Sequence, residues 1–182
     1  NLLNCLICSD ENDFNTLNYK NILEKYSKLT IKKNYLYLVF SLLHKYKRKF
    51  RKKNDKIRVA FICHFFSSDI SKNYLWPIVE GLNNELFEIF LFSDDETNQK
   101  EIHLDWLQFK KRENFFNTSK LNYKKFLKLL YSLNLDIIFE CNGHTDKSRF
   151  EELSYRPAKK QGTFFNILGP SGFDFIDFIP IR

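Results

Sequence analysis

The sequence predicts an α/β protein, a doubly wound parallel sheet preceded by a short helical segment. From residue 57 onward, apolar runs of strand length alternate with amphipathic stretches of helix length. The first of these runs, residues 57–63, is nearly continuous in apolar residues, as expected of a central parallel strand that is buried on both faces. We therefore expect two domains, a helical segment over residues 1–54 and an α/β lobe over residues 55–182.

The helical segment is expected to contain two helices. Apolar residues recur at helical spacing over residues 15–29 and 34–50, and residues 30–33 interrupt the pattern. Two such helices could pack on a neighbouring element or end an array of helical repeats. The chain has no Met, begins at Asn1 and stops at Arg182 directly after a predicted strand, so we expect it to be a piece of a longer protein.

The α/β lobe follows the same alternation to its end. The further strands are expected at residues 87–92, 114–117, 135–140, 161–166 and 173–179, and the helices near residues 72–84, 99–111, 119–133 and 148–153. The loop after the first strand, residues 64–69, contains no glycine. This excludes the Gly-rich loop of dinucleotide-binding domains and the phosphate-binding loop of NTPases.

The net charge of +7 is concentrated in one segment. Residues 44–56 contain eight Lys or Arg and one acid, Asp55, so the rest of the chain sums to zero. A run of this kind fits a contact with phosphates or an acidic partner, and it also fits a solvated linker, which is the commoner fate of like-charge runs. Nucleic acid is an unlikely partner because the predicted sheet edge is not basic.

Cysteine usage indicates a reducing, cytoplasmic compartment without a disulfide framework. Cys5 and Cys8 form a lone C-x-x-C that lacks the second ligand pair of a zinc site, so no metal is expected. Cys63 and Cys141 lie at strand ends and are expected to be buried. The longest apolar stretch, residues 35–43, is far shorter than the ~20 residues of a membrane span, and no signal-peptide pattern is present.

The segment that follows the strand at residues 135–140 is the best candidate site. Ligands of open parallel sheets bind at the carboxyl ends of the strands, and Asn142-Gly143 comes directly after this strand. Gly143 can adopt a positive φ, which would turn the chain sharply and present His144 and Thr145 to a crevice above the sheet. The same residues also fit an ordinary Asn-Gly turn.

Four motifs resemble the catalytic region of the SPINDLY-type protein O-GlcNAc transferases. They are L-N-x-E-x-F-E-I-F-x-F-S-D at residues 82–94, D-I-x-x-x-x-x-G-H-T-x-x-x-R at 136–149, R-P-A-x-x-Q-x-T at 156–163 and S-G-x-x-x-x-D-F at 171–178. The second and third are specific in order and spacing. The two N-terminal helices are similar to the segment that joins the family's tetratricopeptide repeats to its catalytic region.

The resemblance implies the N-terminal Rossmann-like lobe of a GT-B glycosyltransferase, truncated before the second lobe. It implies transfer of a sugar, GlcNAc in this family, from a UDP-sugar to Ser or Thr hydroxyls of a protein, with inversion and without a metal. The UDP-sugar is a co-substrate held mainly by the second lobe, and no other cofactor is implied. An isolated lobe is then expected to be inactive.

The resemblance also assigns roles to residues. Asp69 stands where the family has its proposed catalytic His, and Asp69 and His144 are the predicted catalytic residues. The predicted substrate-binding residues are Asn142, Gly143, Thr145, Arg149 and Arg156. Each has a structural alternative: a turn hydrogen bond for His144, and ion pairs with nearby acids for the arginines. His64, at the end of the first strand, could replace the family His only if the loop is reshaped.

Two departures from the family leave a second function class open. Asp69 replaces a His, and the family's L-G-Y-P-G-T is changed over residues 165–170. The alternative to a glycosyltransferase is therefore a divergent, non-catalytic relative that binds a partner through its helices and basic run. The oligomeric state is not predicted by the sequence.

Overall fold

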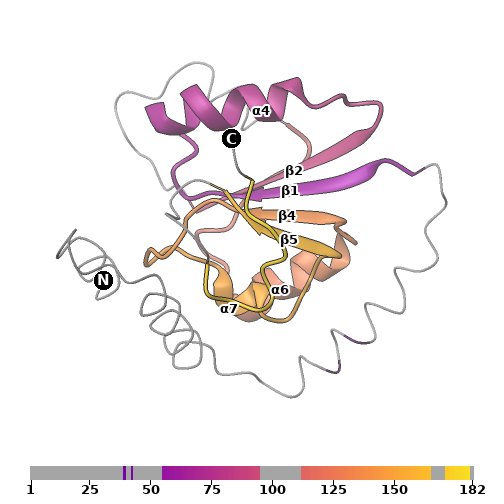
Figure 1. The fold of residues 1–182 in the computed structure, drawn as a ribbon, viewed down its shortest axis with the longest axis vertical. Helices are drawn as coiled ribbons and strands as arrows, with labels where there is room; N and C mark the ends of the chain where they lie inside the picture. The colour runs from indigo at the N-terminus through magenta and orange to yellow at the C-terminus, as the bar shows by residue number, and fades with distance from the viewer. Residues whose placement is uncertain (1–38, 40–41, 43–54, 95–111, 165–170, 181–182) are drawn as a thin grey trace.

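A computed structural model describes residues 39, 42, 55–94, 112–164 and 171–180 of the chain (Figure 1). Five parallel strands form one sheet in the order β3-β2-β1-β4-β5. The strands are β1 (Ile57–Ile62), β2 (Phe87–Ser93), β3 (Phe115–Asn117), β4 (Ile137–Glu140) and β5 (Lys160–Thr163). The predicted α/β fold with a parallel sheet is confirmed.

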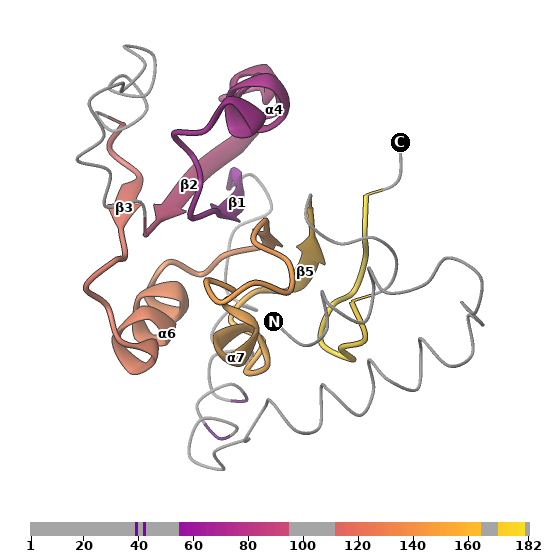
Figure 2. The ribbon, with the colours of Figure 1, turned by 90° about the vertical axis from the view of Figure 1, so that its left-hand side faces the viewer.

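Helices cover both faces of this sheet, as Figure 1 and the turned view in Figure 2 show. A π-helical turn, η2 (Ser71–Leu75), runs into α4 (Trp76–Gly81), and both lie on one face. On the other face lie α6 (Tyr123–Ser132) and α7 (Phe150–Leu153). Asn122 caps α6 by accepting a hydrogen bond from the Lys125 backbone N–H, as expected of Asn at a helix N-terminus.

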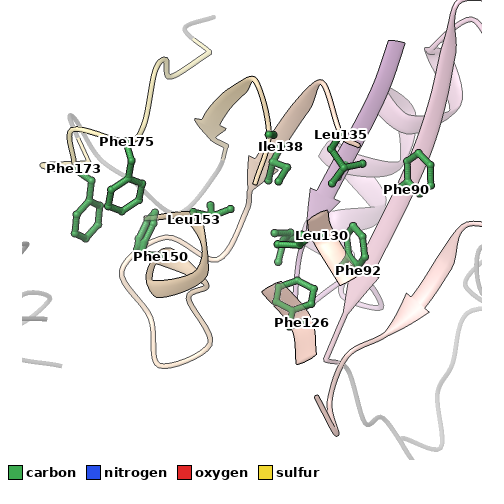
Figure 3. Close-up of a cluster of buried hydrophobic side chains, with 13 residues drawn as sticks. Phe90, Phe92, Phe126, Leu130, Leu135, Ile138, Phe150, Leu153, Phe173 and Phe175 are labelled. Atoms are coloured by element: carbon green, nitrogen blue, oxygen red, sulfur yellow. The ribbon is translucent and has the colours of Figure 1, made fainter. Parts of the chain in front are cut away.

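Alternate residues of each central strand enter different cores, because successive side chains of a strand point to opposite faces. On the α4 side, Val59 and Phe61 of β1 pack with Leu75, Trp76 and Val79. On the other side, apolar residues of β1, β2, β4, α6 and α7 form an aromatic-rich cluster (Figure 3). Burial on both faces explains why β1 is apolar at nearly every position.

The last predicted strand, residues 173–179, is wrong. Ile176 N–H donates to the Phe173 carbonyl, and this turn breaks the extended conformation. The segment makes one parallel bridge, between Gly162 and Phe178. Its alternating Phe residues imitate a strand, but Phe173 and Phe175 are buried because they stack on each other beside Phe150.

Several predictions lie outside the described residues. These are the helices at residues 15–29 and 34–50, apart from the helical Val39 and Leu42, the basic run up to residue 54, the C-x-x-C pair, the helix at 99–111 and the altered segment 165–170. The division of the chain at residues 54 and 55 stays a prediction. Among the described residues, no helix is long and apolar enough to cross a membrane.

Candidate functional site

The sheet order creates a switch point between β1 and β4. The chain leaves β1 toward β2 and β3 on one side and returns to β4 on the other. The connections then diverge from neighbouring strands, and ligands of such sheets bind in the crevice outside the carboxyl ends of the strands. The loops at this crevice, residues 63–70 after β1 and 141–149 after β4, contain most of the predicted site residues.

A polar cavity of about 520 Å³ opens at this carboxyl edge. Its lining comes from the segments that follow β1, β2, β3 and β4. The lining residues are His64, Asp94, Ser119, Leu121, Asp146, Lys147, Ser148 and Arg149. A volume of this size is typical of a small-ligand site.

Asn142 joins the two loops. Its side chain is completely buried. Oδ1 accepts a hydrogen bond from the His64 backbone N–H at 2.8 Å and contacts His64 Nδ1 at 2.9 Å. Nδ2 donates to the Lys147 carbonyl at 2.9 Å. A backbone N–H can only donate and a carbonyl can only accept, so these partners fix the orientation of the amide.

The fixed amide sets the tautomer of His64. Because an amide oxygen only accepts, His64 Nδ1 carries the proton in the contact with Asn142 Oδ1. In the neutral ring Nε2 then holds the lone pair. The imidazole is half-buried, packs edge-on against Phe65 at 4.9 Å between centroids, and lines the cavity. Asn142 was predicted to bind substrate, and this role stays a prediction.

Glu140 anchors the turn that contains Asn142. Its Oε2 accepts from the backbone N–H groups of Asn142 at 3.1 Å and Gly143 at 2.8 Å. Complete burial raises the pKa of this carboxyl to about 8, and the backbone N–H groups of Gly143, Asn142 and Arg149 and the Asn142 side chain oppose the rise. The predicted positive φ of Gly143 is confirmed at 62°.

His144, the next residue, lies in the aromatic core. It is 5% exposed and its ring lies 5.3 Å from Phe150 and 5.6 Å from Phe173. Burial lowers the pKa of the imidazole, and the backbone of Ser171 opposes this shift. The ring is not among the cavity-lining groups, so this placement favours a packing role; the predicted catalytic role stays a prediction. Thr145 accepts from the Lys147 N–H through Oγ1.

Arg149 is the centre of a buried charge network. Its guanidinium contacts Asp94 at 3.0 Å and Glu152 at 3.1 Å, and lies 4.8 Å from the centroid of the Phe126 ring. Asp94 also accepts from the Thr118 hydroxyl at 2.8 Å. Burial raises the pKa of Glu152, and the Arg149 charge opposes the rise. Arg149 also lines the cavity, and its two side-chain ion pairs are with carboxylates.

The remaining predicted residues lie away from the cavity lining. Arg156, at φ 50°, donates to the Phe175 carbonyl at 2.9 Å and pairs with Asp177 at 2.7 Å, so it holds the 171–180 segment. Asp69 is exposed at the beginning of the helix that leads into η2. Of the predicted residues, Arg149 lines the cavity. Asn142, Gly143, His144 and Thr145 lie in the same loop after β4, Asp69 lies near the end of the loop after β1, and Arg156 lies outside both loops.

His64 lines the cavity although it is not among the predicted site residues. Only the adjacency of β1 and β4 brings Asn142 next to it, 78 residues later in the chain. Two polar residues that directly follow two buried strands were the available signal. Within the described ranges, no cluster of His, Cys, Asp and Glu could hold a metal ion.

Comparison with known proteins identifies the lobe. The model of glycosyl transferase family 41 matches residues 14–181. The chain belongs to glycosyl transferase family 41. Membership in family 41 confirms the resemblance drawn from the four motifs to an O-GlcNAc transferase type of catalytic region.

A solved structure supports the same architecture. A mutant O-GlcNAc transferase of Thermobaculum terrenum is similar with a TM-score of 0.61 at 17% identity. The likeness covers 70% of this chain and 24% of that chain, so the family 41 chain spans about a quarter of the matched protein. It confirms the Rossmann-like fold of the lobe. None of the curated proteins compared with the sequence matches it significantly.

Proposed function

We propose that the protein contributes the N-terminal lobe of a GT-B enzyme that transfers GlcNAc from a UDP-sugar to Ser or Thr hydroxyls of proteins, with inversion. Family 41 membership supports glycosyl transfer. The observation that carries the proposal is the polar cavity at the switch point of the sheet, with a hydrogen-bonded imidazole and both signs of charge in its lining.

The proposed division of labour follows from the chemistry. Sugar transfer needs a proton acceptor near the acceptor hydroxyl and stabilisation of the departing diphosphate. The cavity supplies an imidazole, carboxylates and Lys147 for the acceptor side. A second lobe would supply most contacts to the UDP-sugar, so this lobe alone is inactive in the proposal and needs no cofactor of its own.

The proposed partners are a protein acceptor and the UDP-sugar, in the cytoplasm. The free thiols of Cys63 and Cys141, both buried, are compatible with a reducing compartment. Upstream tetratricopeptide repeats would present the acceptor. Asp69 and His144 remain predicted catalytic candidates, and Asn142, Gly143, Thr145, Arg149 and Arg156 remain predicted binding residues.

The test is transfer of radiolabelled GlcNAc from UDP-GlcNAc to protein acceptors by the full-length native polypeptide that contains this sequence. Ser119→Trp fills the cavity and is expected to lower transfer at least tenfold. The matched control is Ser132→Trp on the exposed face of α6. The Ser132 hydroxyl donates to the Leu129 carbonyl of the same helix, and this variant should transfer normally.

Each outcome has a separate meaning. If Ser119→Trp melts like the wild type and transfers at the wild-type rate, the acceptor does not bind in this cavity. A wild-type protein that neither transfers sugar nor binds UDP would favour the alternative, a non-catalytic relative that binds a partner through its helices and basic run.

A further inference from the structure

We propose that His64 accepts the proton of the acceptor hydroxyl in this protein and that Asn142 is the residue that positions it. The inference rests on the proposed function and deepens it. It assigns the acid–base role to the end of β1, five residues before Asp69, which stands at the position of the family's proposed catalytic His.

His64 has the accessibility that the role requires. It follows β1 directly at the switch point, is half-buried and lines the polar cavity. One ring nitrogen, Nδ1, is occupied by the contact with Asn142 at 2.9 Å. The neutral ring therefore keeps its lone pair on Nε2, the form that a general base needs.

Asn142 has the rigidity that a positioning residue requires. Its side chain is buried and bound by both the backbone and the ring of His64. Its amide group is also tied to the Lys147 carbonyl, and its backbone N–H to the Glu140 carboxylate. A base whose orientation is fixed by a third group is the general arrangement of side chains that activate hydroxyl or thiol nucleophiles.

Asp69 is the competing candidate, and the geometry favours His64. Asp69 is exposed and is not among the residues that line the cavity. An imidazole is also intrinsically a stronger base than a carboxylate. The two assignments give opposite results in mutagenesis, because only one of the two side chains can carry the proton-transfer step.

In the proposed step, the acceptor oxygen forms a bond to the anomeric carbon of the sugar while its proton passes to His64 Nε2. The bond from that carbon to the diphosphate oxygen breaks, and UDP leaves with the electron pair. The imidazolium then returns its proton to water. The UDP-sugar is the donor co-substrate, and no oxidant or metal enters the balance.

The first test is the pH dependence of transfer by the full-length native polypeptide. His64→Gln should lower kcat on the order of 100-fold or more with little change in KM for the UDP-sugar. Asn142→Asp places a carboxylate beside the ring and favours the imidazolium, so the acidic limb of the pH profile should move to higher pH by about one unit. The charge-matched control, Asn73→Asp on the exposed surface of η2, should leave the profile in place.

The other titratable and charged groups near the pair are common to all these proteins. Asp94, Asp146, Lys147 and Arg149 face the cavity, and the Glu140 carboxyl accepts from the Asn142 backbone N–H. Because Glu140 also contacts residue 142, a shift of the acidic limb reports on the contact between residues 64 and 142 when the reactivity of His64 itself shifts with it.

A second measurement tests the contact between His64 and Asn142 independently of sugar transfer. Diethyl pyrocarbonate modifies neutral imidazoles, and peptide mass spectrometry gives the rate of His64 modification at each pH. The rate profile of Asn142→Asp should shift in parallel with the activity profile, and bound UDP with an acceptor peptide should protect His64 in the wild type. If Asn142→Asp does not fold, His64→Gln and the wild-type protection still decide the assignment.

The failures are distinguishable. A wild-type protein that transfers no sugar overturns the proposed function and this inference together. Normal transfer by folded His64→Gln, or loss of transfer in Asp69→Asn with normal transfer in His64→Gln, overturns the inference alone. If Asn142→Asp folds and the acidic limb of its pH profile does not shift, Asn142 does not position His64.

Discussion

The loops after β1 and β4 each carry a histidine to the same edge of the sheet, with different results. His64 ends in a polar cavity with its Nδ1 hydrogen-bonded to Asn142. His144 lies between Phe150 and Phe173, 5% exposed. Position at the carboxyl edge of a sheet is therefore insufficient to place a side chain in the cavity, because the covering elements decide whether it meets solvent or the core.

The two loops also differ in how they are held. In the first, the Ser71 hydroxyl donates to the Phe65 carbonyl and the Trp76 indole donates to the Phe66 carbonyl. In the second, Glu140 anchors the beginning of the loop and Arg149 ties its end to Asp94 and Glu152. Neutral hydrogen bonds hold the loop with the accessible histidine, whereas a buried carboxyl and a buried ion-pair network hold the loop with the buried one.

The largest expected effect comes from the charged anchor at the end of the second loop. Arg149→Met leaves two largely buried carboxylates without their cation, so we expect a loss of roughly 3–5 kcal/mol in unfolding free energy. Urea denaturation measures it. Arg58→Met is the control, because the pair between Arg58 and Glu88 is about a third exposed, at 31% and 33%, and should matter less. Equal losses in both variants would mean that burial of the Arg149 ion pairs adds nothing to their effect on stability.

Glu140→Gln tests the anchor at the beginning of that loop. The folded pKa of about 8 lies above the ordinary value of 4.5, so the native state holds a proton that the unfolded state releases between these values. Unfolding free energy should then fall as pH rises from 4.5 to 8, by up to about 1.4 kcal/mol per pH unit from this group. The fall should be smaller in Glu140→Gln and unchanged in Glu85→Gln, an exposed control.

The smallest effect concerns the buried histidine. Because burial lowers the pKa of His144, its contribution to stability is present above pH 6.5 and lost as pH falls through the folded pKa. His144→Phe should remove this acid sensitivity between pH 7 and 5.5, while His64→Gln retains it. Thermal melts at both pH values measure the difference. A folded His144→Phe protein that transfers no sugar would instead support the catalytic prediction for His144.

Local patterns were sufficient to predict most of the described fold. Continuous apolar runs identified β1, β2 and β4, because central parallel strands are buried on both faces. The same reasoning failed for residues 173–179, where alternating Phe residues pack around a turn beside α7. Apolar alternation shows which side chains are buried, and it does not show whether a neighbouring strand is free to pair.

The site was less predictable than the fold for a related reason. The positive φ of Gly143 follows from its residue type and the turn around it. Three features depend on which loops lie side by side in the fold, and no local sequence pattern predicts that arrangement. They are the contact between His64 and Asn142, the burial of His144 and the ion pairs of Arg149. The motif spacing identified the family and left the identity of the base open.

The central position of β1 also has a consequence for how the molecule assembles. Its partner strand β2 follows closely, with Arg58 and Glu88 30 residues apart, whereas His64 and Asn142 are 78 apart. Closing the longer loop has the higher entropic cost and must await synthesis of β4. During chain growth, the edge of β1 that pairs with β4 therefore stays uncovered longer than the edge that pairs with β2. This is the edge at which His64 later contacts Asn142.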